Sequence, residues 1–510
     1  MRQGKNRRLA NVKTRRETGL DHVMFNLDLN TPFGRKQLKE IQPYYPGEEA
    51  ELREELDRVE QMIRFVKQNR TLTDKIQEVF MEVKDPSLTV QRSGATTLSV
   101  VELYEVKSLL LQMRQLRKLT MEHEIGDYKG SHCISEIKAG ESQKEEASDS
   151  APAEGEPVVE TVPEEYFLEN TEDLLDELDP RGDRMNTFYI YNEFSPLLTE
   201  YRTKKREYEL LIRKEQKQTR EELRKKYGVQ LTPKFDIVVA KSHPDFDKIQ
   251  AIEELEVTDQ DYMSVTMQLK PTEQIYDYIC EVERINADID MEEERIRELL
   301  SRKVSLKAEV LMDNCDKMGA LDLALARAIY SIKHDLVKPE IVDDHVVEFE
   351  DGRNLQVEDI IKAKGKDYCP ISLALKDGVT LITGANMGGK TISLKLAGQV
   401  PILAQYGFFV PATKARVGLS NYMQILIGDS QSVERGLSSF GSEMEELKEI
   451  LDHGVERSLI LIDEIASGTN PTEGTALTKS LVDYLIEKPY ISLITTHFES
   501  VTERKGVVNM

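Results

Sequence analysis

The sequence LITGANMGGKT, at residues 381–391, decides the fold of the C-terminal part of this chain. It follows the spacing G-x-x-x-x-G-K-T and lies between an apolar, strand-like run at residues 379–382 and a helix-like run. Glycines in such a loop let backbone N–H groups point at phosphate oxygens, and the following helix adds the partial positive charge of its N-terminus. A simple glycine-rich turn is the alternative. The phosphate-loop interpretation assigns nucleotide binding to Gly384, Ala385, Asn386, Met387, Gly388, Gly389, Lys390 and Thr391, with Thr391 also binding Mg²⁺.

Two further apolar runs end in polar residues. Residues 459–462 are followed by Asp463 and Glu464, and residues 491–494 are followed by two threonines and His497. Buried parallel strands have this pattern, and ligands bind at their C-terminal ends in open α/β sheets. We expect Asp463 to hold Mg²⁺ through water and Glu464 to polarise the attacking water. A lone histidine is more often structural, but His497 ends a third element at the same expected edge.

Four segments carry a family resemblance. In chain order they are TGANMGGKT, GLSSFGSEMEELKEIL, LILIDEIASGTNPTEG and TTHF, and together they resemble the MutS branch of the ABC-type ATPases. Ala385 stands where that family usually has proline, and Thr391 stands where it often has serine; neither change removes a required group. The stretch IGDSQSVERGLSSF is closer to the MutS paralogues than to the mismatch-sensing proteins.

This resemblance implies a P-loop ATPase that binds ATP and Mg²⁺ and uses Glu464 and His497 in catalysis. It also implies a homo- or heterodimer formed through the ATPase domains, in which Ser438 of one subunit contacts the γ-phosphate bound by the other. In this family an aromatic side chain stacks on adenine, and Tyr368 is the candidate because tyrosine supplies a flat π face. A half-buried surface tyrosine is the alternative interpretation of Tyr368.

Composition restricts the function and the location. The chain has 510 residues, a net charge of −24 and a pI near 5.0, which argues against broad, nonspecific binding to duplex DNA. Its four cysteines are scattered without a C-x-x-C pair, which predicts reduced thiols in a cytoplasmic protein. No apolar run approaches the roughly eighteen residues of a membrane span, so no membrane partner is expected.

The charge and the hydrophobic periodicity of the N-terminal part of the chain predict three different segments. Residues 1–16 carry seven lysines and arginines and no acid, which predicts a basic disordered arm over residues 1–20, or an anion-binding tail. Residues 21–129 have helical periodicity, and TPFGR at residues 31–35 resembles the start of the MutS core, or lever, domain. Residues 130–165 include a stretch with nine acids and one lysine, which predicts an acidic disordered insert.

Residues 166–330 are expected to continue the helical core and to carry an antiparallel coiled-coil clamp arm. Ser195 and Pro196 mark the start of a long helix and Gly228 marks its end. Between this helix and its return lies a predicted tip, residues 229–270, with four lysines and eight acids and hence a net charge of −4. A tip that grips DNA should be basic, so its charge favours a protein client.

The predicted architecture is therefore multidomain, α plus α/β, with a helical core and clamp arm followed by an ABC-type ATPase with a mainly parallel sheet over residues 331–510. The family continues beyond this point, so we expect the ATPase domain to be incomplete or to rely on a partner. The leading function is a MutS-like ATPase that drives conformational switching on DNA, in mismatch repair or recombination. The alternative is a protein-remodelling ATPase, such as a reactivating factor for a cobalamin-dependent aminomutase.

Overall fold

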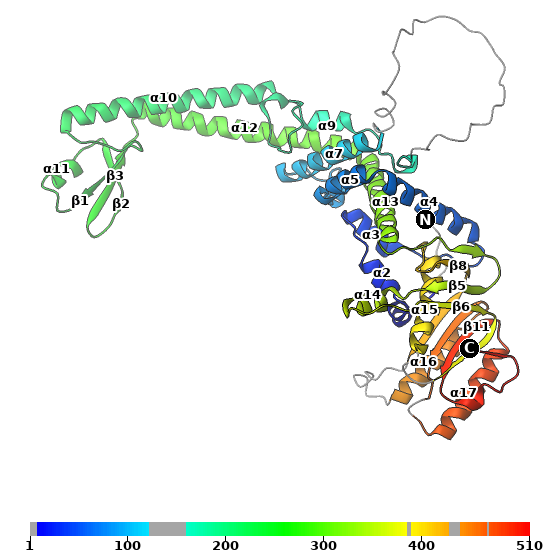
Figure 1. Cartoon of the computed structure of the whole chain (residues 1–510). Helices are drawn as coiled ribbons and strands as arrows, with labels where there is room; N and C mark the ends of the chain where they lie inside the picture. Colours follow the sequence, from blue (N-terminus) through cyan, green and yellow to red (C-terminus); the bar gives the residue numbers. More distant parts are fainter. Residues whose placement is uncertain (1–7, 122–159, 385–388, 428–438, 467–468) are drawn as a thin grey trace, which may run out of the picture. The chain divides into compact units, whose positions relative to one another are not determined.

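The computed structural model describes residues 8–121, 160–384, 389–427, 439–466 and 469–510 (Figure 1). The chain divides into two compact units that do not follow the sequence in simple order. Unit 1 comprises Met1–Val83, Gln115–Leu168 and Asn314–Met510, and unit 2 comprises Lys84–Arg114 and Glu169–Asp313. The domain boundaries given above stay a prediction.

The core of unit 1 is a five-stranded sheet in which all neighbouring strands are parallel, in the order β12–β7–β11–β10–β9. Its strands are β7 (Gly378–Thr383), β9 (Tyr422–Ile427), β10 (Ser458–Asp463), β11 (Tyr490–Thr496) and β12 (Val507–Asn509). Every residue of β10 and β11 is buried, which is the pattern of strands covered on both faces. The sequence prediction of a mainly parallel sheet is confirmed.

Helices cover both faces of this sheet. They are α15 (Lys390–Gln405), α16 (Ser439–His453) and α17 (Pro471–Ile486). Ile460 and Ile462 of β10 share a core cluster with apolar residues of α16 and α17. Leu461, whose side chain alternates to the other face, lies against Gly398 of α15. The strand ends at the C-terminal edge are therefore held rigidly between packed layers.

A second, four-stranded sheet in unit 1 has the order β4–β8–β5–β6. The β4–β8 pair is parallel and the other two pairs are antiparallel. Its strands are β4 (Glu340–Val342), β5 (Val346–Gly352), β6 (Ile371–Lys376) and β8 (Lys414–Gly418), with α14 (Leu355–Ala363) between β5 and β6. The other helices of unit 1 are α1 (Val12–Glu17), α2 (Leu20–Phe25), α3 (Pro32–Glu40), α4 (Glu49–Gln68), α5 (Arg70–Glu82), most of α13 (Ala308–Lys333) and two 3₁₀ turns, η2 (Glu164–Tyr166) and η5 (Glu499–Val501).

Two predictions of disorder are wrong for the residues that the structure describes. Residues 8–20, assigned to a basic disordered arm, contain α1 and bury Leu9 and Ala10 against the parallel sheet. Residues 160–165, assigned to the acidic insert, are also ordered: Val162 is buried, and Glu160 pairs with Arg64 of α4 at 2.6 Å. In both segments a few apolar side chains and specific ion pairs outweigh the bias in charge. Residues 1–7 and 122–159 lie outside the described part of the chain.

Unit 2 is built around two long helices, α10 (Pro196–Tyr227) and α12 (Glu273–Leu306), which Figure 1 shows side by side. They run in opposite directions: Arg202 near the start of α10 pairs with Glu293 in the second half of α12 at 2.7 Å, whereas Tyr208, farther along α10, lies against Tyr278 near the start of α12 with ring centroids 5.8 Å apart. The predicted boundaries of α10 are confirmed: the Ser195 side chain caps its N-terminus, and Gly228 ends it with a positive φ of 71°. Unit 2 also contains α6 (Ser87–Arg92), most of α7 (Val100–Met121), α9 (Glu172–Leu178) and η3 (Asn192–Phe194).

The segment between α10 and α12 forms the tip with its own small core. An antiparallel sheet has the order β1–β3–β2, with β1 (Asp236–Ala240), β2 (Leu255–Gln260), β3 (Ser264–Leu269) and the short helix α11 (Phe246–Gln250). Its inner face packs a cluster that includes Leu223 of α10, Val239, Val265 and Met267. The acidic side chains therefore remain on the outside, and Glu256, Asp259 and Asp261 are all exposed.

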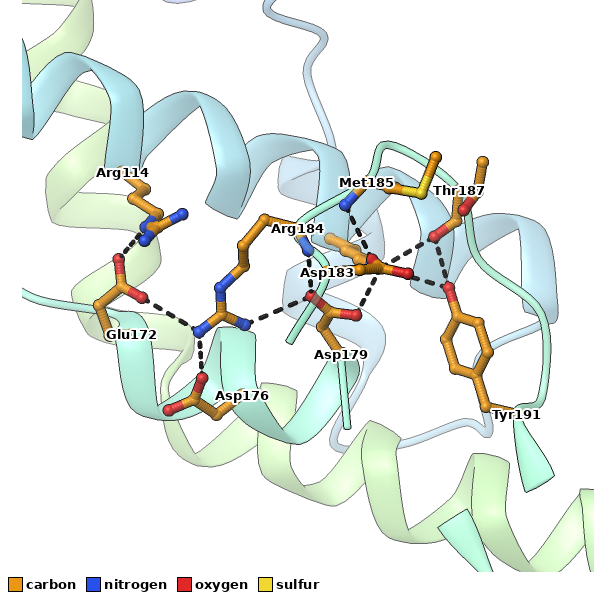
Figure 2. A network of polar contacts seen from close by, with 10 residues as sticks. Arg114, Glu172, Asp176, Asp179, Asp183, Arg184, Met185, Thr187 and Tyr191 are labelled. Carbon is orange, nitrogen blue, oxygen red and sulfur yellow. Dashed lines mark hydrogen bonds and ion pairs between the residues drawn. The ribbon is translucent and has the colours of Figure 1, made fainter. Parts of the chain in front are cut away.

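Elsewhere in unit 2, Lys107 of α7 and Asp179, the residue directly after α9, form a buried ion pair. The side chains of Lys107 and Asp179 are both 0% exposed, and Lys107 Nζ lies 3.2 Å from Asp179 Oδ1 and 2.9 Å from the carbonyl oxygen of Thr187. Burial alone would raise the pKa of Asp179, but the backbone N–H of Arg184 and the charge of Lys107 outweigh it and lower that pKa. Figure 2 shows Arg184 between Asp179 and Asp176, with both of which it pairs.

Among the helices that the structure describes, none is long and apolar enough to cross a membrane. The described cysteines, Cys280, Cys315 and Cys369, form no disulfide, and Cys133 lies outside the described residues.

Candidate active site

The predicted phosphate loop connects β7 to α15, as its sequence requires. Gly384 follows the last residue of β7 with φ of 152°, and Gly389 caps α15 with φ of 89°. Side chains with a Cβ rarely adopt these backbone conformations, which explains the two glycines of the motif. Ala385, Asn386, Met387 and Gly388 lie outside the described residues. Helix α15 thus begins at Lys390, and Thr391 is its second residue.

Lys390 is buried at the start of α15, with only 8% of its surface exposed. Its ammonium donates to the carbonyl oxygen of Gly384 at 3.0 Å and to Glu464 Oε1 at 2.7 Å. The contact with Glu464 joins the phosphate loop to the end of β10. Two residues that lie 74 positions apart in the chain are therefore direct neighbours, as the two motifs predict.

Thr391 and Asp463 form a second link between the same elements. The Thr391 hydroxyl donates to Asp463 Oδ2 at 2.7 Å, so two oxygen ligands of the kind that Mg²⁺ prefers lie side by side. The other carboxylate oxygen, Asp463 Oδ1, accepts a hydrogen bond from the Thr495 hydroxyl at 2.5 Å. Asp463 is buried, and its orientation is fixed from both sides by these hydroxyl groups.

The loop after β10 has a strained backbone that β11 holds in place. Glu464 and Ala466 have positive φ values of 48° and 60°, which are uncommon for residues with a Cβ and cluster at functional sites. The Glu464 N–H donates to both the carbonyl and the hydroxyl oxygen of Thr495, each at 3.1 Å. Glu464 is therefore presented at the C-terminal edge of the sheet while its backbone stays attached to β11.

Helix α16 also contacts this loop. Glu443 Oε2 accepts a hydrogen bond from the Ala466 N–H at 3.1 Å, and Glu443 is itself buried. Burial raises the pKa of Glu443 above its ordinary value. The sequence motifs predict no role for Glu443 or Thr495, although Thr495 is a polar residue of the TTHF segment at the end of an apolar strand.

The remaining predicted site residues have other contacts or lie outside the described residues. His497 follows β11 and is exposed, with its ring centroid 4.1 Å from that of Phe498. Tyr368 precedes β6 and is half-buried, and its hydroxyl accepts from the Asn354 N–H at 3.0 Å. Burial raises the pKa of Tyr368. Within the described part of the chain, neither side chain has a hydrogen bond to Lys390, Thr391, Asp463 or Glu464, so their roles stay predictions, and Ser438 lies outside the described residues.

Comparison with known proteins agrees with the motifs. Residues 380–509 match the family model described as MutS domain V. The chain is 36% identical over 225 residues to endonuclease MutS2 of Shouchella clausii, an alignment that covers 42% of this chain and 28% of that protein. It is 31% identical over 261 residues to endonuclease MutS2 of Clostridium botulinum, covering 50% of this chain and 32% of that protein.

A mismatch repair protein gives a similar match. The chain is 33% identical over 217 residues to DNA mismatch repair protein MutS of Salinibacter ruber, covering 41% of this chain and 24% of that protein. The aligned segments thus span less than a third of the length of these relatives. The resemblance to the MutS family that the sequence predicts is confirmed, at this partial coverage.

Proposed function

We propose that this chain binds ATP and Mg²⁺ at the C-terminal edge of its parallel sheet and hydrolyses the γ-phosphate. The observation that carries the proposal is the pairing of two motifs distant in sequence: Lys390 contacts Glu464 at 2.7 Å, and Thr391 contacts Asp463 at 2.7 Å. A P-loop NTPase needs these four groups close together, because the lysine binds the phosphates, the hydroxyl and the aspartate hold the metal, and the glutamate orients the attacking water. The match of residues 380–509 to MutS domain V supports the same proposal.

The donor set at this point fits Mg²⁺. One hydroxyl, from Thr391, and one carboxylate, from Asp463, lie within hydrogen-bond distance of each other. Among the described residues, no group of three or more His, Cys, Asp or Glu side chains could hold a metal. Mg²⁺ is usually bound by one or two protein oxygens together with substrate phosphates and water, so two protein ligands suit it. When bound, the ion would neutralise charge that develops on the phosphates.

The ion pair between Lys390 and Glu464 gives each residue a role. ATP phosphates would compete with Glu464 for the buried ammonium of Lys390, which donates at most three hydrogen bonds. Lys390 would then bind the β- and γ-phosphates, and the released Glu464 carboxylate would orient and polarise the attacking water. Asp463 would keep its position throughout, because Thr495 holds its second oxygen. We further propose that this cycle changes the conformation of the chain.

Binding can be tested by titrating ATP with Mg²⁺ into the full chain in a calorimeter. Lys390→Ala should weaken binding roughly 30-fold or more, because it removes the cation that would pair with the phosphates, and loss of one partner of a buried charged pair costs about 2–5 kcal/mol. Lys414→Ala, which removes an exposed lysine of β8, is the matched control and should bind as the wild type does. Equal affinities for wild type and Lys390→Ala would contradict the proposed site.

We also propose that two ATPase domains associate, as a homodimer or a heterodimer, around the nucleotide. In ABC-type ATPases the phosphate loop of one subunit meets the signature segment of the other, and Ser438 is the residue predicted to contact the γ-phosphate. Helix α16 begins directly after that residue, at Ser439. A helix start is suited to an anion, because its backbone N–H groups are unpaired.

DNA is the first candidate partner, and a protein client is the second. The names of the relatives, endonuclease and DNA mismatch repair protein, favour DNA. The tip favours a protein client: Lys248, one of its four lysines, is already paired with Asp245 at 2.9 Å, and the acids on β2 are exposed. A backbone-binding surface would need cations there.

Fluorescence anisotropy with a short duplex DNA at low salt separates the two candidates. DNA binding through the arm predicts affinity that falls with salt, with a log–log slope near −0.9 per phosphate contact. Reversing the charge of Lys241, on the tip, should then lower both the affinity and the slope. If no binding is detected at low salt, where electrostatic attraction is strongest, the protein-remodelling function becomes the first candidate.

A further inference from the structure

An N-terminal strap, residues 8–18, is built into the edge of the parallel sheet in unit 1. Ala10 forms a parallel bridge with Met423 of β9, and the Met423 N–H donates to the carbonyl oxygen of Leu9 at 2.7 Å. Leu9 and Ala10 are only 1% and 2% exposed. The Thr14 hydroxyl accepts from the Ile425 N–H at 3.2 Å. The strap therefore covers an edge strand and cannot detach without exposing apolar side chains and unpaired backbone donors.

Side chains of the strap pair with α16. Lys13 Nζ lies 2.6 Å from Glu446 Oε1 and also donates to the carbonyl oxygen of Ile427 at 3.2 Å. Asn11 Nδ2 lies 3.3 Å from both carboxylate oxygens of Glu449, one turn farther along the helix. The side chains of Lys13 and Glu446 are 22% and 25% exposed, so solvent screens this ion pair only in part.

The same helix face reaches the candidate active site. Glu443, one turn before Glu446, accepts the hydrogen bond from Ala466, which is two residues after Glu464. Glu443, Glu446 and Glu449 occupy positions spaced by three along α16, where like charges repel. Lys13 supplies a positive charge against this row. The strap, α16 and the strained loop that presents Glu464 are thus joined by a continuous series of contacts.

The other end of the strap contacts the phosphate-loop helix. Glu17 pairs with Lys395 of α15 at 2.8 Å. Thr18 lies so close to Gly398 of α15 that a Cβ built there would be 2.6 Å from Thr18 Cγ2. The strap therefore contacts both α15, which carries Lys390, and α16, which contacts the loop of Glu464.

We propose that the N-terminal strap positions the catalytic loop of the ATP site, and that Lys13 acts as a positioning residue through Glu446 on α16. The inference rests on the proposed function, because the readout of that position is ATP turnover. Among the described residues, Lys13 has hydrogen bonds to Ile427 and Glu446 and none to Lys390, Thr391 or Glu464. Its loss should therefore lower kcat and leave the KM for ATP nearly unchanged.

The test is a charge swap in the full chain, measured by steady-state ATP hydrolysis. Lys13→Glu adds a fourth carboxylate to the row and should lower kcat about tenfold, the change that roughly 1.4 kcal/mol produces. The double variant Lys13→Glu with Glu446→Lys restores an opposite-charge pair and should recover most of the lost kcat. Glu445→Lys reverses an exposed charge on the same helix and should leave kcat unchanged. If Lys13→Glu does not fold, Lys13→Met, which only deletes the charge, should show a smaller loss of kcat.

A second measurement needs no ATP and separates failure of this inference from failure of the proposed function. Hydrogen–deuterium exchange of the peptide containing residues 464–466 should be faster in Lys13→Glu and return toward wild type in the double variant. If the wild type hydrolyses no ATP, the proposed function fails, whatever the exchange shows. If the wild type hydrolyses ATP and Lys13→Glu matches it in both kcat and exchange, or the swap restores neither, the inference is overturned.

Discussion

Replacing Thr495 by valine tests whether the site depends on the orientation of Asp463. The Thr495 hydroxyl donates to Asp463 Oδ1 at 2.5 Å, and the whole residue is 0% exposed. Valine keeps the volume of the side chain but replaces the hydroxyl by a methyl group. The Glu464 N–H keeps its bond to the Thr495 carbonyl oxygen at 3.1 Å, so the perturbation acts mainly on Asp463.

The expected loss of activity can be estimated from the hydrogen bond that Thr495→Val removes. A hydrogen bond to a charged group contributes about 1.5–3 kcal/mol, and here the carboxylate oxygen left behind is buried. If the intact orientation is required for turnover, this energy corresponds to a decrease of roughly 10- to 150-fold in kcat/KM for ATP. Thr495→Ser retains the hydroxyl and should recover most of the activity.

The measurement is kcat/KM from steady-state ATP hydrolysis, and circular dichroism checks that each variant is folded. Ser492→Ala is the matched control: Ser492 lies on the same strand, is buried, and its hydroxyl has no hydrogen-bond partner in the described part of the chain. Its removal should leave kcat/KM unchanged. If Thr495→Val is as active as Ser492→Ala, the hydroxyl of Thr495 does not orient a group that the reaction needs, and the reasoning is wrong.

Three further predictions concern stability and assembly. Lys107→Met should destabilise unit 2 by about 3–5 kcal/mol, because it leaves Asp179 buried without its lysine, whereas Lys214→Met on an exposed position should have little effect in denaturant unfolding. Burial lowers the pKa of His345 below its unfolded value of about 6.5, so the folded state binds fewer protons and loses stability as pH falls below that value. His345→Gln should remove this part of the acid destabilisation, as melting temperatures measured over a pH series would show. ATP should promote association of the Glu464→Gln variant, and an unchanged mass by light scattering would argue against a nucleotide-dependent dimer.

The sequence suffices to predict those parts of the candidate site that are contiguous in the chain. The phosphate loop and the Asp463–Glu464 pair each lie in a short motif whose chemistry depends on local spacing. Their meeting across the sheet also follows, because the C-terminal ends of parallel strands share one edge. Burial of an unbroken apolar strand was equally predictable for β10 and β11.

Contacts between elements could not be predicted in the same way. Glu443 lies in a helix with many acidic residues, and only the packing of α16 shows that it accepts a hydrogen bond from Ala466. Thr495 is one of two adjacent threonines, and the register of β10 and β11 decides which one faces Asp463. Alternation along a strand makes such a choice sensitive to a shift of one residue.

The N-terminal strap shows how composition can mislead. A run of basic residues without acids resembles a solvated arm, but Leu9 and Ala10 within it are buried on β9. The carboxylates that pair with Lys13 and accept from Asn11 lie more than 400 positions away on α16. Counting charges over a short stretch of sequence cannot detect ion-pair partners that lie so far apart in the chain.

Single-turnover hydrolysis of ATP, with Mg²⁺ present, tests the central claim most directly when wild type is compared with Glu464→Gln. The amide keeps the size of the side chain but cannot accept a proton from water. We predict that both proteins bind ATP, that the wild type hydrolyses it, and that Glu464→Gln is slower by roughly 10²- to 10⁴-fold, the usual contribution of a general base. Equal hydrolysis rates in the two proteins, at equal occupancy, would contradict the assignment of this cluster as the catalytic site.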